Sequence, residues 1–174
     1  MTAAVVLIGA PGAGKTRTGK RVAAALGLPH VDTDKVFVAA HGPVADFFAA
    51  HGEAEFRRIE RDLVAEALDS DAVVSLGGGA VLDDRTQALL ADLPVVQLTS
   101  SPEAILERVA AEPEQLAKRP LLAAGGLDDG LARWTALVAA RKPIYDRLAT
   151  VTIDTSHRTM TSVAEEVVAW LRTR

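Results

Sequence analysis

One short stretch decides the fold of this chain: Gly9-Ala10-Pro11-Gly12-Ala13-Gly14-Lys15-Thr16. It follows an apolar run, 4–8, and precedes an amphipathic run, which is the strand-to-helix context that the spacing G-x-x-x-x-G-K-[ST] requires. The glycines let successive backbone N–H groups point into one concavity that holds phosphate oxygens. A lysine adds positive charge at the β- and γ-phosphates, and the following hydroxyl suits Mg²⁺. The motif predicts a nucleotide phosphate site made of Gly12, Ala13, Gly14, Lys15 and Thr16, with Thr16 also a metal ligand.

Short β-branched runs alternate with longer amphipathic runs along the whole chain. Strands are expected at 4–8, 28–31, 72–76, 95–98 and 151–153, and helices at 15–26, 53–68, 84–90, 102–110, 128–147 and 161–171. This alternation predicts one α/β domain over 1–174, a doubly wound five-stranded parallel sheet flanked by helices. Ligands are expected at the carboxyl ends of its strands. Two segments, 38–52 and 112–126, are expected to be mobile loops because of their proline and glycine content.

Composition excludes several functional classes. The net charge of −4 does not favour binding to nucleic acid or to an anionic membrane. The chain has no cysteine, so disulfides and zinc–thiolate sites are excluded, and a reducing cytoplasm is the expected compartment. Asparagine is also absent, which excludes the Asn-Lys-x-Asp motif that reads guanine in GTPases. No apolar run is long enough to span a bilayer.

An acidic pair, Asp32 and Asp34, follows the second expected strand. Alternation along a strand would place both carboxylates on one face, at the sheet edge where the phosphate loop lies. Phosphoryl transfer needs a group that holds the metal shell and a group that accepts the hydroxyl proton. A solvated turn with an aspartate helix cap is the structural alternative. The neighbouring phosphate loop favours the catalytic interpretation.

Two further motifs are expected at the same edge. The run Gly77-Gly78-Gly79 exposes bare backbone that a ligand can approach closely. The pair Lys118-Arg119 lies in the expected mobile segment, and an arginine on a loop that closes over phosphate can neutralise developing charge. A flexible turn and a solvated basic pair are the respective alternatives.

Taken together, these motifs resemble those of the shikimate kinase family over nearly the whole chain. The resemblance rests on the phosphate loop, Asp32-x-Asp34, Gly52-Glu53-x-x-Phe56-Arg57-x-x-Glu60, Leu76-Gly77-Gly78-Gly79, Arg119-Pro120-Leu121-Leu122 and Arg141-x-Pro143-x-Tyr145. It implies a P-loop kinase fold with a mobile lid at about 112–126 and a substrate-binding insert at about 34–62. It also implies transfer of the γ-phosphate of ATP to the 3-hydroxyl of shikimate, with Mg²⁺, by a cytoplasmic protein that is commonly monomeric.

The same resemblance assigns roles to individual residues. Shikimate would be held by Asp34, Arg57, Gly78, Gly79 and Arg141. The catalytic residues would be Lys15, Asp34 and Arg119, with Arg119 reaching both ligands from the lid. The metal shell would include Asp32 and Thr16. Arginine pairs well with a carboxylate and aspartate accepts from hydroxyls, which suits an acid that carries ring hydroxyls.

Some positions depart from the family pattern. Val38 stands where a glutamate is common, and the lid lacks a second arginine, for which Lys118 is a candidate. The loop expected to contact adenine has Arg158-Thr159-Met160 in place of Arg-x-Pro, and Arg158 is retained as a nucleotide-binding residue. Two other functions stay open on sequence alone: a gluconate-type kinase, and an ATP-binding sensor without turnover.

Helical geometry separates two adjacent arginines. On the wheel of the helix 53–68, Phe56, Ile59, Leu63 and Ala67 share one face. Relative to Phe56, Arg57 lies at about 100°, at the border of that face, and Arg58 at about 200°, toward solvent. Glu60 lies at about 40°, inside the apolar face, and therefore needs a partner. We expect Glu60 to hold the Arg57 guanidinium toward the substrate, with a purely structural salt bridge as the alternative.

Overall fold

The computed structural model describes residues 2–111 and 127–174 and contains a five-stranded parallel sheet. The strands are β1 (Val5–Gly9), β2 (His30–Asp32), β3 (Val73–Ser75), β4 (Val95–Thr99) and β5 (Val151–Asp154). Their order is β2-β3-β1-β4-β5, and every neighbouring pair is parallel. The predicted doubly wound α/β fold is therefore confirmed. Because the strands are parallel, the loops that follow β1, β2 and β3 leave the sheet at the same edge.

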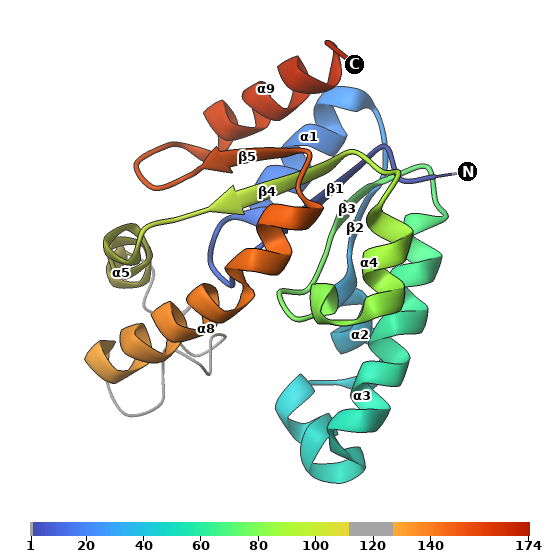
Figure 1. Ribbon diagram of the computed structural model, residues 1–174, viewed down its shortest axis with the longest axis vertical. Coiled ribbons are helices and arrows are strands. Elements are labelled where there is room, and N and C mark those ends of the chain that lie inside the picture. The colour runs from blue at the N-terminus through green and yellow to red at the C-terminus, as the bar shows by residue number, and fades with distance from the viewer. Residues whose placement is uncertain (1, 112–126) are drawn as a thin grey trace.

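Helices cover both faces of the sheet (Figure 1). One face carries α1 (Lys15–Leu26) and α9 (Met160–Leu171), and the other carries α3 (Val44–Leu68), α4 (Asp84–Leu90) and the end of α8 (Leu127–Leu148). The remaining elements are α2 (Thr33–His41), a 3₁₀ turn η1 (Ala80–Leu82) and α5 (Pro102–Ala111). Figure 1 shows α5 and the first turns of α8 beyond the end of β4, and α2 with the start of α3 projecting beside the sheet.

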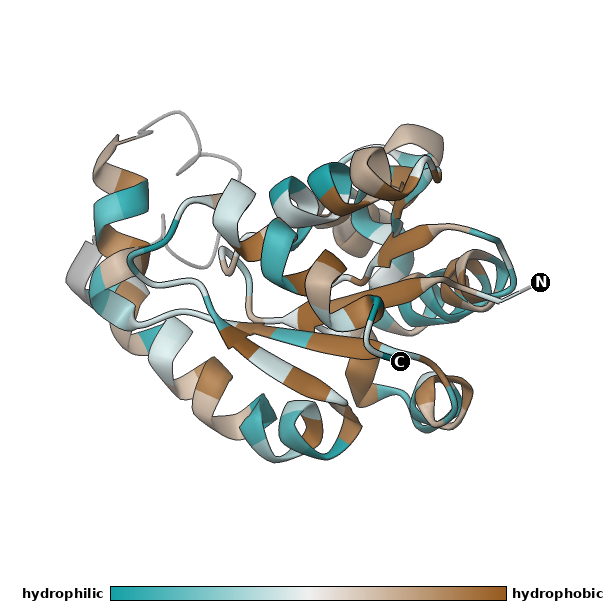
Figure 2. Cartoon of the chain, turned by 90° about the horizontal axis from the view of Figure 1, so that it is seen from above, coloured by the Kyte–Doolittle hydropathy of each residue, from teal (hydrophilic) through white to brown (hydrophobic). Residues whose placement is uncertain are grey.

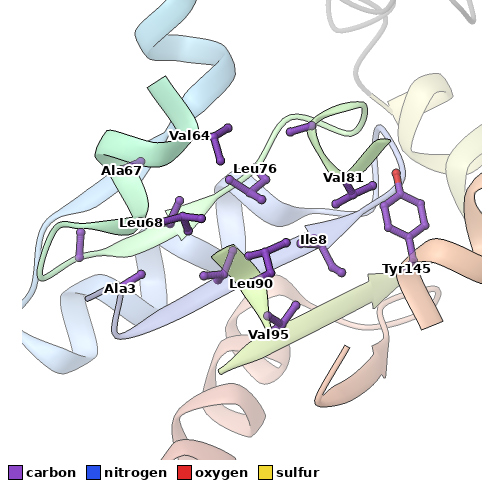
Figure 3. Close-up of a cluster of buried hydrophobic side chains, with 14 residues drawn as sticks. Ala3, Ile8, Val64, Ala67, Leu68, Leu76, Val81, Leu90, Val95 and Tyr145 are labelled. Carbon is purple, nitrogen blue, oxygen red and sulfur yellow. The ribbon is translucent and has the colours of Figure 1, made fainter. Parts of the chain in front are cut away.

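Strand β1 is buried on both faces and divides the core in two. Val6 and Ile8 pack with α3, α4 and α8, whereas Val5 and Leu7 pack with α1 and α9. Figure 2 shows the apolar strands between helices that carry both hydrophilic and hydrophobic residues, and Figure 3 shows the first of the two clusters. The near-continuous hydrophobic run of β1 is the pattern expected of a central parallel strand.

The expectation that 38–52 is a loop was wrong. Asp32 caps α2 by accepting from the Lys35 N–H at 3.2 Å, and α2 continues to His41. After Gly42 and Pro43, α3 begins at Val44 and is interrupted only at Gly52, whose φ is 81°. The glycines and the proline mark helix ends and a break. The same residues are common in flexible loops, so the sequence pattern alone does not distinguish the two structures.

The reason for this helical structure is a separate aromatic core. All four phenylalanines of the chain gather between α2 and α3, where Phe37 packs edge-on against Phe47 and Phe56, and Phe48 against Phe56. Such edge-to-face pairs add to the stabilisation from burial. No short-range pattern shows this, because Phe37 and Phe56 lie on different helices.

The segment 112–126, where a lid was predicted, lies outside the described residues. Among the helices that the structure describes, none is long and apolar enough to cross a membrane.

Replacing Phe37 with alanine tests the aromatic core. Phe37 is 2% exposed, so Phe37→Ala should lower the free energy of unfolding by about 3–5 kcal/mol, the usual cost of such a cavity. The matched control is Val38→Ala, because Val38 is next in the same helix and 43% exposed. Urea denaturation of both variants gives the measurement. Equal losses in the two variants would contradict the packing of α2 described here.

Candidate functional site

The phosphate loop connects β1 to α1 and is shaped by its glycines. Gly12 and Gly14 have φ values of 86° and 97°, a conformation that strongly favours glycine. Gly14 is the N-cap of α1 and provides no side-chain cap, so the first N–H groups of α1 stay available to an anion. The Lys15 ammonium donates to the carbonyls of Gly9 at 2.8 Å and Ala10 at 3.0 Å, which places its charge over this loop.

The two residues predicted for the metal lie in contact. The Thr16 hydroxyl donates to Asp32 Oδ2 at 2.5 Å, across from the first turn of α1 to the end of β2. Among the described residues, no group of three or more His, Cys, Asp or Glu side chains could enclose a metal ion. A hydroxyl and a carboxylate are nevertheless oxygen donors of the kind that Mg²⁺ prefers. Two protein ligands are enough, because bound Mg²⁺ usually keeps several of its waters. The donor set therefore fits Mg²⁺.

Ser75 belongs to the same site, although the sequence analysis did not select it. It pairs with Asp32 in the register of β2 and β3, and its hydroxyl donates to the Lys15 carbonyl at 3.2 Å. His30 Nε2 lies 2.9 Å from the same hydroxyl. Burial lowers the pKa of His30, so the neutral ring is favoured there. A serine at the carboxyl end of a buried strand was the available signal.

A cleft of about 530 Å³ joins the phosphate loop to the acidic pair. Its lining includes Lys15 and Thr16 on one side and Asp32 and Asp34 on the other. The predicted proximity of the two acids to the phosphate loop is therefore observed, but its predicted basis is wrong. Asp32 ends β2, whereas Asp34 lies in the first turn of α2 and is not on the strand. The start of a helix, and not strand alternation, places Asp34 in the cleft.

The Asp34 residue is exposed overall, but the cleft encloses its carboxyl group and desolvates it. Burial raises the pKa of Asp34, the Lys15 charge lowers it, and Asp32 raises it further. The nearest backbone is that of Gly77, where an added Cβ would lie 2.3 Å from Asp34 Oδ1. Gly77 N–H donates to the Thr33 hydroxyl at 3.0 Å, which fixes this close approach.

Each glycine of the run 77–79 lies against a different functional side chain. A Cβ at Gly79 would lie 2.7 Å from Arg57 Nη1, and one at Gly78 would lie 3.4 Å from Arg141 Nη1. With Asp34 beside Gly77, three of the predicted substrate-binding side chains surround one short loop. The glycines therefore leave room for these side chains, which a flexible turn would not require.

The predicted pairing on α3 is confirmed. Arg57 Nη1 lies 2.6 Å from Glu60 Oε2, and the Glu60 residue is 8% exposed. Burial raises the pKa of Glu60, while the hydrogen bond from Arg57 lowers it. Arg58, in contrast, is half exposed and pairs with Glu55 at 2.8 Å and Asp62 at 3.3 Å on the outer face. The helix register inferred from the sequence is correct.

A second cavity of about 260 Å³ adjoins the phosphate loop and contains the most important residue that sequence reasoning missed. Arg108, in the last turn of α5, donates to the carbonyls of Gly12 at 3.1 Å and of Thr155. Arg158 and Met160 also line this cavity, and Arg158 is paired with Glu166 at 2.5 Å. The sequence signal for Arg108 was its position in the helix after β4, near the carboxyl edge. Lys118 and Arg119 lie outside the described residues.

The chain is similar to known proteins over nearly its whole length. The family model for shikimate kinase matches residues 11–172. A shikimate kinase from Mycobacterium bovis is 41% identical over 174 residues, 99% of this chain and 95% of that protein. One from Symbiobacterium thermophilum is 42% identical over 173 residues, 98% of this chain and 97% of that protein.

The fold comparison agrees with the sequence comparison. The structure of shikimate kinase from Acinetobacter baumannii in complex with shikimate has a TM-score of 0.86 and is 27% identical. The match covers 99% of this chain and 94% of that chain. With a family match over most of its length, relatives above 40% identity and the site geometry described above, this chain belongs to the shikimate kinase family.

Proposed function

We propose that this protein transfers the γ-phosphate of ATP to the 3-hydroxyl of shikimate, giving shikimate 3-phosphate and ADP, a step toward chorismate and the aromatic amino acids. The observation that carries the proposal is the meeting of a phosphate loop with Asp34, Arg57 and Arg141 around one glycine run. Family membership supports the same activity. The experiment that tests it measures ADP formation with purified protein, ATP and shikimate, with gluconate as the alternative acceptor.

The nucleotide-binding part of the site consists of the phosphate loop and the residues beside it. We assign the phosphates to the N–H groups of residues 12–16 and to Lys15, and the base to the second cavity beside Arg108, Arg158 and Met160. Thr16 and Asp32 would hold Mg²⁺, which when bound neutralises charge on the β- and γ-phosphates. Arg119 stays a proposal from the family resemblance, as a lid residue that neutralises the transferring phosphoryl group.

The shikimate-binding part of the site must provide groups that bind a carboxylate and hydroxyls. Arg57 and Arg141 offer guanidinium groups to the carboxylate, and the bare backbone of Gly78 and Gly79 allows the ring to approach. Arg57 is already held by Glu60, so its guanidinium is ordered before the ligand arrives. Preorganisation of this kind reduces the entropy lost on binding.

Asp34 is the proposed general base. Its carboxylate would accept the proton of the 3-hydroxyl while that oxygen bonds to the γ-phosphorus and the bond from phosphorus to the bridging oxygen of ADP breaks. A raised pKa makes a carboxylate a stronger base, and burial provides this for Asp34. The Lys15 charge opposes this shift and favours the ionised form of the base.

Two other functions are less well supported. A gluconate-type kinase shares the fold, but the family match and the relatives above 40% identity are to shikimate kinases. An ATP-binding sensor would not need a carboxylate such as Asp34 beside the acceptor site. The predicted cytoplasmic location and monomeric state stay predictions.

Asp34→Asn tests the general base. The amide keeps the shape but cannot accept a proton, so kcat should fall by about 10² or more while ATP affinity changes little. In the unmodified protein, kcat should fall as pH falls through the pKa of Asp34, and burial places this limb above about pH 4, the ordinary range for aspartate. A change confined to nucleotide affinity would assign Asp34 to the metal shell.

Arg57→Ala and Arg58→Ala form a matched pair on one helix. Arg57→Ala removes a guanidinium that pairs with the shikimate carboxylate. The KM for shikimate should therefore rise about tenfold or more, which is the effect of losing a charge-assisted hydrogen bond. The KM for ATP should be unchanged. Arg58→Ala should change neither KM, because Arg58 pairs with Glu55 and Asp62 on the outer face of the helix. Steady-state kinetics on both variants provides the comparison. The opposite order would overturn the assignment of Arg57.

Glu60→Gln separates function from stability. Since burial raises the pKa of Glu60, its charged form is disfavoured in the folded protein, and the stability that goes with protonation is lost as pH rises through that pKa. Glu60→Gln should therefore unfold at a higher Tm at neutral pH, with a smaller difference in mild acid, yet show a higher KM for shikimate because Arg57 is less well held. Thermal unfolding at the two pH values decides the first point. A lower Tm at neutral pH would mean that the ion pair outweighs the burial cost.

A further inference from the structure

Helix α8 presents a stripe of three large side chains to the catalytic edge of the sheet. Trp134, Arg141 and Tyr145 are separated along the helix so that, at 100° per residue, all three lie within about 40° of one another. Arg141 has a proposed role with shikimate. Trp134 and Tyr145, each almost completely buried, have none in the mechanism above.

Trp134 is bonded to the phosphate loop. Its indole N–H donates to the Pro11 carbonyl at 2.8 Å, and the residue is 1% exposed. The ring packs with Ala10 of the loop and with Ile105 and Val109 of α5. A buried indole N–H needs an acceptor, and here the acceptor is a backbone oxygen of the loop that must bind anions. This hydrogen bond to α8 keeps the partly negative carbonyl oxygen of Pro11 turned away from the phosphate site.

Tyr145 makes the equivalent contact with the glycine run. Its hydroxyl donates to the Gly78 carbonyl at 2.7 Å, and the residue is 2% exposed. Figure 3 shows its ring reaching from α8 toward the segment that carries Val81, with the hydroxyl at the far end. Burial raises the pKa of Tyr145, so the hydroxyl keeps its proton and donates at neutral pH. The Arg141 guanidinium lies against the same glycine, because a Cβ at Gly78 would be 3.4 Å from Arg141 Nη1.

The two anchored loops touch each other. A Cβ at Gly78 would lie 3.3 Å from Pro11 Cδ, so the proline ring of the phosphate loop lies against the glycine run. Pro11 and Gly78 are thus neighbours in space, and the carbonyl of each is held by a side chain of the same helix. One rigid element therefore sets the position of both loops.

We infer that Trp134 and Tyr145 are positioning residues for phosphoryl transfer, and this inference rests on the proposed function. Trp134 holds the loop that binds the phosphates, and Tyr145 holds the glycine run at the acceptor site, against which Arg141 lies. Through them, α8 fixes the distance between the γ-phosphate and the hydroxyl that attacks it. Displacement of reacting groups by about 1 Å is enough to slow a reaction strongly.

Two conservative substitutions separate the two anchors. Trp134→Phe keeps an aromatic ring but removes the N–H, so the Kd for ADP should rise about tenfold while the Kd for shikimate is unchanged. Tyr145→Phe removes a single oxygen, so the Kd for shikimate should rise about tenfold while the Kd for ADP is unchanged. These factors correspond to loss of one buried hydrogen bond. Both variants should show a lower kcat with saturating substrates.

The control is Trp170→Phe, because Trp170 is the other tryptophan and lies on α9, stacked with Arg174 and away from both loops. It should leave both Kd values and kcat unchanged. Calorimetric titrations give the Kd values, and thermal unfolding is recorded for all variants. Tyr145→Phe removes one oxygen atom, so it tests the inference even if the Trp134→Phe variant does not fold.

The outcomes are distinct. A lower Tm with both Kd values unchanged, or equal weakening of both ligands in each variant, would show that the two side chains only stabilise the fold and would overturn the inference. An unmodified protein that binds neither shikimate nor ADP, or that binds both without turnover, would overturn the proposed function itself. A higher Kd for ADP alone in Trp134→Phe and a higher Kd for shikimate alone in Tyr145→Phe, with an unaffected Trp170→Phe, would support the positioning roles.

Discussion

The site depends on one topological constraint, the position of β3 between β2 and β1. Because these strands are neighbours and parallel, the phosphate loop, the acidic residues after β2 and the glycine run after β3 must leave the sheet side by side. Asp32 and Ser75 are register partners, so the end of β3 lies directly beside the proposed metal ligand at the end of β2. Exchanging the order of the strands would separate these groups even if every local motif formed.

Three loops are crowded at one edge of the sheet, which explains why residues 77–79 at that edge are all glycine. Asp34, Arg57 and Arg141 all approach the backbone of 77–79 at distances where a Cβ would be in the way or in tight contact. Bare backbone solves the steric problem and leaves peptide groups facing the acceptor. The same crowding brings charges together, because Lys15 acts on Asp34 and Arg57 acts on Glu60. Asp34 and Glu60 thus each have a nearby cation, although the protein as a whole is negatively charged.

Much of this arrangement was predictable from the sequence, and the exceptions have a common physical cause. The phosphate loop, the strands and the register of α3 follow from local periodicity and motif spacing. Asp34 and the segment 38–52 were misplaced because their structure depends on contacts between α2 and α3, and Phe37 packs on residues that are distant in the chain. Arg108 was missed for the same reason, since its partners at Gly12 and Thr155 come from opposite ends of the sequence.

The departure at Met160 shows how packing can replace a family residue. The family commonly has proline there, and here the methionine sulfur lies 2.4 Å from where a Cβ of Gly14 would be and 3.6 Å from the Thr18 hydroxyl. The unbranched thioether adapts to the start of α1 and still presents apolar surface to the second cavity. Arg108 lines the same cavity with a planar guanidinium. The cavity therefore keeps both the apolar surface and the cationic plane that suit a flat aromatic base, although the sequence at this loop differs from the family pattern.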